Sequence, residues 1–173
     1  HYFGAILFGA IAFYFYAKKM GLDIWLALDA VAPGLLIGQA IARPANFINQ
    51  ELYGQPTALP WGLSIPLEHR ILPYTDLATY PLETRFHPTF LYESLATLAL
   101  YLLLFTLGAR HYERLKTGDL LAGYLIGYAV IRFFIEILRP DAWKMGSLAA
   151  AQVFSLIFVA VGVIFLVIRR RRR

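Results

Sequence analysis

The chain contains no cysteine among its 173 residues, and only 16% of its residues are charged. The absence of cysteine excludes a disulfide framework, a thiolate metal site and a thiol nucleophile supplied by this protein. A soluble domain carries about 25% charged residues because its surface must face water. The chain is instead 59% hydrophobic, which indicates an integral membrane protein. We expect no metal and no cofactor.

The apolar residues gather into five runs, and a run of about 20 apolar residues can span the membrane as a helix. The sequence therefore predicts an all-α, polytopic membrane protein with one membrane domain over residues 1–173 and about five transmembrane helices. One long outward loop, residues 43–87, is too polar to cross and too rich in proline to form one helix. The predicted spans cover about residues 2–17, 24–42, 88–108, 120–138 and 149–168.

The first span is short for a full crossing, and the chain starts at His1 without an initiator methionine. We therefore expect that upstream helices or a neighbouring protein cover this span and help to close the site described below. Small residues let helix backbones approach closely, so the packing face would be Gly4, Gly9 and Ala10.

Basic residues form three clusters that fall at alternate ends of the spans, so all three lie on the same side of the membrane. The positive-inside rule makes that side cytoplasmic, with the C-terminus, and places the loops 43–87 and 139–148 outside. The terminal arginines are then a topology anchor on anionic lipid, and we expect no nucleic-acid partner. The clusters are Lys18 and Lys19, then Arg110, Arg114 and Lys116, then Arg169 to Arg173.

Two charges lie inside the fourth span. A charged side chain at that depth costs about 2.5–3.5 kcal/mol, so Arg132 and Glu136 normally need a partner or a wet cavity. On a helix they share one stripe with Tyr124, Tyr128 and Arg139. One interpretation is an internal Arg132–Glu136 pair, which leaves Arg139 unexplained. The other interpretation is a functional site.

Polar residues from three spans and the long loop reach one depth, near the outer headgroups of the membrane. Arginine offers a bidentate fork that matches phosphate, while histidine and glutamate can transfer protons. The group therefore predicts a lipid-headgroup site with acid–base capacity. It comprises Arg43, Asn46, Asn49, Glu51, His87, Tyr92, Glu93, Arg132, Glu136 and Arg139.

Two of the polar residues also have structural interpretations. His87 precedes a proline, and a His-Pro pair commonly opens a helix with the proline at its first position. Asp29, in the second span, could simply pack between helices.

Three ordered motifs resemble the prolipoprotein diacylglyceryl transferase family. Residues 43–54, Arg-Pro-Ala-Asn-Phe-Ile-Asn-Gln-Glu-Leu-Tyr-Gly, are similar to the family signature Gly-Arg-x-Gly-Asn-Phe-x-Asn-x-Glu-x-x-Gly. Residues 87–93 look like its His-Pro-x-x-Leu-Tyr-Glu block, and residues 128–139 match its Tyr-x-x-x-Arg-Phe-x-x-Glu-x-x-Arg helix. Asp29 with Ala32 and Pro33 is similar to the Asp-x-x-Ala-Pro that precedes the signature.

The resemblance implies a transferase of the bacterial inner membrane that acts in lipoprotein biosynthesis, with its site near the outer leaflet. It would move the diacylglyceryl group of phosphatidylglycerol to the lipobox cysteine of a prolipoprotein, releasing glycerol phosphate. The implied partners are thus phosphatidylglycerol and the prolipoprotein lipobox peptide. The implied catalytic residues are Arg43, Arg132, Glu136 and His87, and the implied substrate-binding residues are Asn46, Asn49, Glu51, Gly54, Tyr92, Glu93, Tyr128 and Arg139.

The same resemblance suggests individual roles. Arg43 and Arg132 would bind the phosphate and stabilise the leaving group. Glu136 would orient Arg132, and Arg139 would act as a further cation or gate. The substrate thiol must lose its proton, because the thiolate is the nucleophile.

The chain departs from the family pattern near its start and around Arg43. Ala42 and Ala45 stand where the signature has glycines. The family usually has a His-Gly-Gly-like motif before the first span, and its histidine should fall near Phe3 in this chain. His1 is either that histidine displaced, a neutral interfacial residue or a leftover of expression. We also expect that the family's amino-terminal helices, one bearing an important tyrosine, lie outside this chain.

Two other functions stay open at this point. The first is a non-catalytic relative that serves as a structural or lipid-holding subunit of a larger membrane complex. The second is a fragment of a transporter or channel, which the interruption of the second span at Pro33 and Gly34 suggests. Against a channel, the polar residues gather at one side of the membrane and do not cross it.

Overall fold

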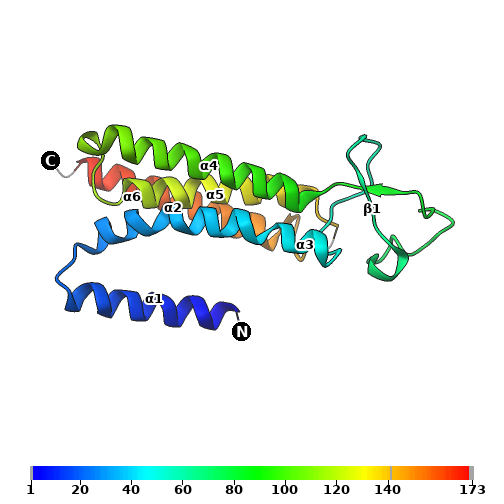
Figure 1. Cartoon of the computed structure of the whole chain (residues 1–173), viewed down its shortest axis with the longest axis horizontal. Coiled ribbons are helices and arrows are strands. Elements are labelled where there is room, and N and C mark those ends of the chain that lie inside the picture. Colours follow the sequence, from blue (N-terminus) through cyan, green and yellow to red (C-terminus); the bar gives the residue numbers. More distant parts are fainter. Residues whose placement is uncertain (1, 141, 172–173) are drawn as a thin grey trace.

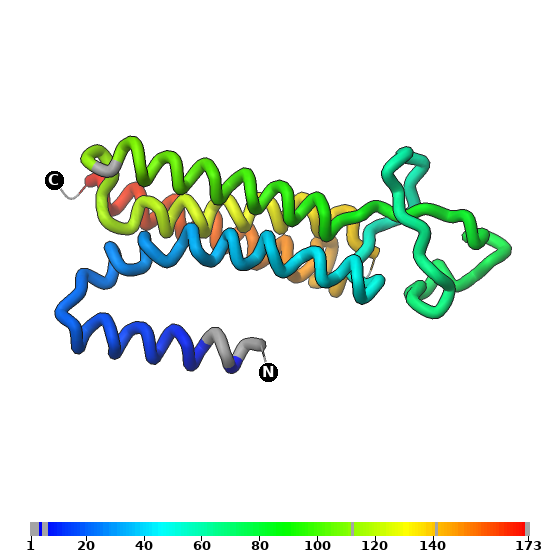
Figure 2. Tube along the Cα trace, in the orientation of Figure 1, coloured from blue at the N-terminus to red at the C-terminus, as the bar shows by residue number. Residues whose placement is uncertain are grey.

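The computed structural model describes residues 2–140 and 142–171, so the predictions made for His1 fall outside the described residues. Most of the chain is helical, and its long helices, apart from the first, lie side by side as a bundle (Figure 1). Figure 2 shows that the first helix is joined to the second by a turn and stands apart from the other helices. The long helices are α1 (Tyr2–Lys19), α2 (Ile24–Ala42), α4 (Thr89–His111), α5 (Asp119–Ile137) and α6 (Ala150–Arg171).

The prediction of a helical, polytopic membrane protein is confirmed. Within the described part of the chain, four helical segments are long and apolar enough to cross a membrane. Helix α1 is a helix as predicted but is not one of the four. The four segments are Ile24–Ile48, Thr89–His111, Asp119–Ile137 and Ala150–Arg171.

The bundle has two chemically different ends. At one end, which we call the basic end, α1, α4 and α6 finish and α2 and α5 begin (Figure 1). The described residues of the three basic clusters that the sequence places on one side all lie there. At the opposite end, which we call the loop end, residues 49–88 leave the bundle and fold beyond it.

Helix α2 continues without a break through Pro33, contrary to the interruption that the sequence indicated. A proline has no N–H to donate to the carbonyl four residues earlier, but its ring can be accommodated in a helix with a local adjustment. The broken span that suggested a transporter is therefore absent from this helix. A short helix, α3 (Pro44–Ile48), follows directly and extends the loop end of α2.

Glycines bring α5 close to its neighbours on two sides. A Cβ added to Gly127 of α5 would lie 2.6 Å from the Leu100 side chain of α4. A Cβ on Gly162 of α6 would lie 2.6 Å from the Ile126 side chain of α5. Because membrane helices gain stability from such close packing, these contacts fix α5 between α4 and α6.

Short strands and turns complete the connections, which the all-helical prediction did not include. In the long loop, β1 (Leu63–Ser64) pairs antiparallel with β2 (Arg85–Phe86), and η1 (Leu67–His69) lies between them. The 3-10 helix η2 (Tyr112–Arg114) follows α4. Between α5 and α6, β3 (Lys144–Met145) pairs antiparallel with β4 (Leu148–Ala149).

One buried arginine organises the loop. Arg70 is 5% exposed and donates hydrogen bonds to the carbonyls of Ile65, Tyr80, Pro81 and Leu82 over 2.8–3.0 Å. Because these carbonyls come from two separate segments of the loop, the guanidinium ties residue 65 to residues 80–82. Residues 52–88 thus form a folded unit around the apolar core Tyr53, Ile65, Tyr74 and Phe86.

Candidate active site

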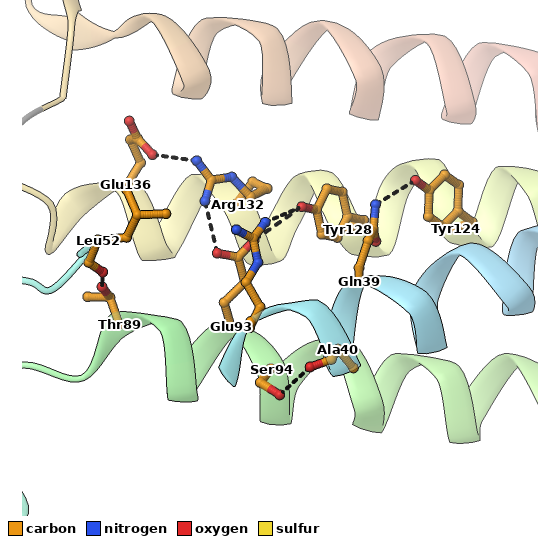
Figure 3. A network of polar contacts seen from close by, with 11 residues as sticks. Gln39, Ala40, Leu52, Thr89, Glu93, Ser94, Tyr124, Tyr128, Arg132 and Glu136 are labelled. Carbon is orange, nitrogen blue, oxygen red and sulfur yellow. Dashed lines mark hydrogen bonds and ion pairs between the residues drawn. The ribbon is translucent and has the colours of Figure 1, made fainter. Parts of the chain in front are cut away.

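A chain of ion pairs joins three helices at the loop end of the bundle (Figure 3). Glu93 of α4 lies at its centre, with Oε1 2.7 Å from Nη2 of Arg43 and Oε2 3.0 Å from Nη1 of Arg132. Arg132 also pairs with Glu136, one turn farther along α5, at 2.8 Å. We call these residues, Arg43, Glu93, Arg132 and Glu136, the arginine–glutamate network.

Helical spacing explains why α5 presents its polar residues together. Tyr128, Arg132 and Glu136 are four residues apart and therefore lie on one face of the helix. The Tyr128 hydroxyl donates to Oε1 of Glu93 at 3.1 Å and accepts from Nη2 of Arg43 at 3.2 Å. Tyr128 therefore holds the centre of the network against α2.

A second polar contact lies one turn toward the basic end. Gln39 of α2 donates through Nε2 to the hydroxyl of Tyr124 at 3.1 Å. The rings of Tyr124 and Tyr128 stack, with centroids 6.0 Å apart and planes 7° from parallel. Helices α2 and α5 are thus joined by polar side chains at two successive turns.

Glu93 is held in place by hydrogen bonds from its own helix to neighbouring backbone. Ser94 donates through Oγ to the Ala40 carbonyl of α2 at 2.8 Å, and Thr89 donates through Oγ1 to the Leu52 carbonyl at 2.5 Å (Figure 3). The start of α4 is therefore fixed to both α2 and the loop of the signature motif, residues 49–54, which we call the signature loop.

The network is largely withdrawn from the surface. The exposed fractions of the side chains are 22% for Arg43, 19% for Arg132, 5% for Glu93 and 7% for Glu136. Buried ion pairs contribute little to stability after desolvation, so their presence at membrane depth favours a functional role.

One atom of the network has no internal partner. The Nε of Arg43 is buried and makes no hydrogen bond within the described part of the chain. Buried donors nearly always have a partner, so such an atom indicates a position for a ligand oxygen or a water. Because this nitrogen is covered by protein atoms, a ligand oxygen or a water can reach it only after neighbouring groups move.

The structure brings together five of the residues that the sequence singled out: Arg43, Glu93, Tyr128, Arg132 and Glu136. The Arg132–Glu136 pair exists, but it is not isolated, because Arg132 also binds Glu93 on another helix. Arg139 lies just beyond the end of α5, where its backbone N–H donates to the Glu136 carbonyl at 3.2 Å.

The signature loop forms a tight turn next to this site. Glu51 donates its backbone N–H to the Asn46 carbonyl, and its side chain accepts from Nδ2 of Asn49 at 3.1 Å. Gln50 and Leu52, on either side of Glu51, both have a φ of 55°, a conformation that few residues with side chains adopt. Such backbone strain is concentrated at functional sites, which fits the predicted role of this loop.

Gly54 occupies a crowded crossing where the signature loop passes the start of α4 and the end of α5. A Cβ on Gly54 would lie 2.7 Å from Cγ2 of Thr89, 2.8 Å from Cβ of His87 and 3.0 Å from the Leu138 carbonyl oxygen. Its N–H donates to the His87 carbonyl at 2.7 Å. The position requires glycine for packing, whatever part Gly54 takes in binding substrate.

His87 and Tyr92 belong to a separate cluster. Nδ1 of His87 lies 3.2 Å from the Tyr92 hydroxyl, which also accepts a hydrogen bond from Nε1 of Trp61 at 2.8 Å. Consecutive residues on a helix point about 100° apart, so Tyr92 and Glu93 face different directions. The predicted gathering of His87 and Tyr92 around the arginines is therefore not seen in their hydrogen bonds.

Some residues of the site escaped the sequence analysis. Gln39 lies four residues before Arg43, so the helical period alone could have found it. Trp61 and Arg70 come from a loop without periodicity and carry no such signal. Within residues 2–140 and 142–171, no group of three or more histidine, aspartate or glutamate side chains is arranged to hold a metal ion.

Comparison with known proteins agrees with this arrangement of membrane-crossing helices around the arginine–glutamate network. A family model described as prolipoprotein diacylglyceryl transferase matches residues 1–168. The chain therefore belongs to the prolipoprotein diacylglyceryl transferase family, and the resemblance of its three motifs is confirmed.

The relatives with curated names have the same description. The phosphatidylglycerol–prolipoprotein diacylglyceryl transferase of Synechococcus elongatus is 46% identical over 167 residues, which cover 95% of this chain and 56% of that protein. The protein of that name from Chloroflexus aggregans is 41% identical over 184 residues, covering 98% of this chain and 60% of the relative. The chain thus spans little more than half the length of these relatives.

Proposed function

We propose that this protein transfers the diacylglyceryl group of phosphatidylglycerol to the lipobox cysteine of a prolipoprotein. The observation that carries the proposal is the pair of half-buried arginines, Arg43 and Arg132, that Glu93 bridges at the loop end of the membrane helices. Guanidinium groups match phosphate in both charge and geometry. The relatives' shared name specifies the lipid and the protein substrate of that chemistry.

The proposed reaction joins the substrate sulfur to the lipid and depends on the arginines of the network to stabilise the leaving group. The substrate sulfur forms a bond to the terminal glyceryl carbon while the bond from that carbon to the phosphate oxygen breaks. Glycerol phosphate leaves with the electron pair, and nearby guanidinium groups stabilise the charge that it gains. Because Glu93 holds Arg43 and Arg132 in place beforehand, little reorganisation is needed when that charge develops.

We assign the roles from these contacts. The partly exposed guanidinium groups of Arg43 and Arg132 bind the phosphate oxygens, and Arg132 is oriented by Glu136. His87, whose ring is held by Tyr92, accepts the thiol proton, since the thiolate is the nucleophile. The residues that would line the headgroup pocket are Asn46, Asn49, Glu51, Gly54 and Arg139.

We propose that the basic end is cytoplasmic and that the loop end faces outward, with the site near the outer leaflet of the bacterial inner membrane. The positive-inside rule supports this orientation, because the basic clusters share one end of the bundle. An outward site also suits a prolipoprotein whose cysteine has already crossed the membrane.

We propose further that neighbouring helices, from the same or another protein, pack on α1. A Cβ on Gly4 or Gly9 would meet no atom within 4 Å, so this small-residue face is open to a partner helix. Such a cover would enclose the partly exposed Arg43 and Arg132. A structure with this face in bulk lipid and both arginines fully enclosed would contradict this part of the proposal.

The activity is tested by incubating the purified protein with phosphatidylglycerol and a lipobox peptide, then measuring the peptide mass. We expect a mass increase equal to one diacylglyceryl group and release of glycerol phosphate in equal amount. A peptide with serine in place of the cysteine is the control and should stay unmodified. Absence of the thioether, under conditions in which the Synechococcus elongatus relative modifies the same peptide, would refute the proposed function.

A further inference from the structure

Asp29 lies in the half of α2 nearest the basic end, far from the proposed active site, and the residue is 7% exposed. Its Oδ2 accepts a hydrogen bond from the N–H of Gly118 at 2.6 Å, and its Oδ1 accepts from the N–H of Leu121 at 2.8 Å. Both N–H groups belong to the start of α5, which leaves its first N–H groups without partners inside the helix. A side chain of α2 therefore caps α5.

The two bonds reproduce a complete capping box. In that motif the N-cap side chain binds the N–H of the third helical residue, and the side chain of that residue binds the N-cap N–H. Gly118 is the N-cap of α5 and Leu121 is its third residue. The single carboxylate of Asp29 makes both bonds, and its negative charge favours the positive end of the helix dipole.

Helix α5 cannot supply this cap itself. Gly118 has no side chain, and its φ of +97° disfavours any residue that has one. A Cβ at this position would also lie 2.7 Å from the ring of Phe165 on α6. The usual capping residues are therefore excluded, and the start of α5 depends on α2.

The cap has a consequence for the proposed active site. Helix α5 carries Arg132, whereas Arg43 follows the last turn of α2, about 21 Å along that helix from Asp29. We propose that Asp29 is a positioning residue that sets the axial register of α5 against α2, and thereby the placement of Arg132 relative to Arg43. Its effect on turnover rests on the proposed function, whereas its effect on register does not.

The register can be measured independently of activity. Ile41 of α2 and Phe134 of α5 are exposed near the loop end, and the chain has no cysteine that would compete for a label. Nitroxide labels on Ile41→Cys and Phe134→Cys, in protein reconstituted in nanodiscs, report the separation of the two helices by double electron–electron resonance. With Asp29→Ala the main distance should shift or spread by about 1.5 Å or more, the rise of one helical residue.

Asp23→Ala is the matched control. Asp23 is also a capping aspartate at the basic end, but it caps its own helix, accepting from the N–H groups of Trp25 and Leu26. Its loss should leave both the label distance and turnover near those of the parent protein. Asp29→Ala should lower turnover about 10- to 100-fold, because small misplacements of reacting groups have effects of that size.

Further variants keep the test decisive. Asp29→Asn retains one acceptor oxygen and should give an intermediate shift and an intermediate loss; it replaces Asp29→Ala if that variant does not fold. Gly118→Ala should move the start of α5 and reproduce the shift. Unchanged distances in all three variants would overturn the proposal, even if turnover fell. A shift in a protein that shows no transferase activity would support the register role and count against the proposed function alone.

Discussion

Replacing Arg132 by lysine keeps the positive charge at the centre of the network but removes the guanidinium fork. Arg132 uses Nη1 for Glu93 at 3.0 Å and Nη2 for Glu136 at 2.8 Å. A lysine ammonium is one compact group on a flexible chain, and it cannot occupy both positions. Either Glu93 or Glu136, both nearly buried, must therefore lose its contact with residue 132 in the Arg132→Lys variant.

The size of the effect follows from these contacts. A hydrogen bond to a charged group contributes about 1.5–3 kcal/mol, and a buried group left unpaired costs a similar amount. If Arg132 also stabilises the departing phosphate, the same loss raises the reaction barrier. Each 1.36 kcal/mol changes the rate by about tenfold, so we expect kcat/KM to fall about 10- to 100-fold.

The assay is the mass-spectrometric measurement of the lipidated peptide, made with equal amounts of folded protein. Arg114→Lys is the control, because Arg114 is exposed at the basic end and should tolerate the same change. Thermal unfolding in detergent separates loss of activity from loss of fold. Equal activities of the Arg132→Lys and Arg114→Lys variants would show that the fork has no part in catalysis.

Three other predictions test orientation, packing and proton transfer. A single cysteine at Thr75 should react with an impermeant maleimide on intact cells, whereas one at Thr117 should not; the reverse result would invert the proposed orientation. Gly54→Ala should lower the free energy of unfolding by about 1–3 kcal/mol through overpacking, whereas Gly38→Ala, which has open space, should be neutral or stabilising by up to about 1 kcal/mol. His87→Gln should reduce turnover while the unfolding temperature stays near that of the parent; unchanged turnover would exclude His87 as the proton acceptor.

The sequence by itself determined the features that depend on one helix at a time. The apolar runs locate the helices, and the helical period aligns Tyr128, Arg132 and Glu136 on one face of α5. The alternation of the spans places the basic clusters at one end of the bundle. The three motifs identify the family, because each lies within a short, continuous stretch of chain.

Only the tertiary structure decided which faces of different helices meet. Periodicity fixes the face of a helix but not its rotation or depth against a neighbour, so it could not show that Glu93 bridges Arg43 and Arg132. Nor could it place His87 with Tyr92 and Trp61, because the loop that brings Trp61 there has no period. The same limit applies to Asp29, whose carboxylate caps a helix some 90 residues later in the chain. Gly118 itself has no side chain to supply a cap, and its close packing against Phe165 leaves no room for one.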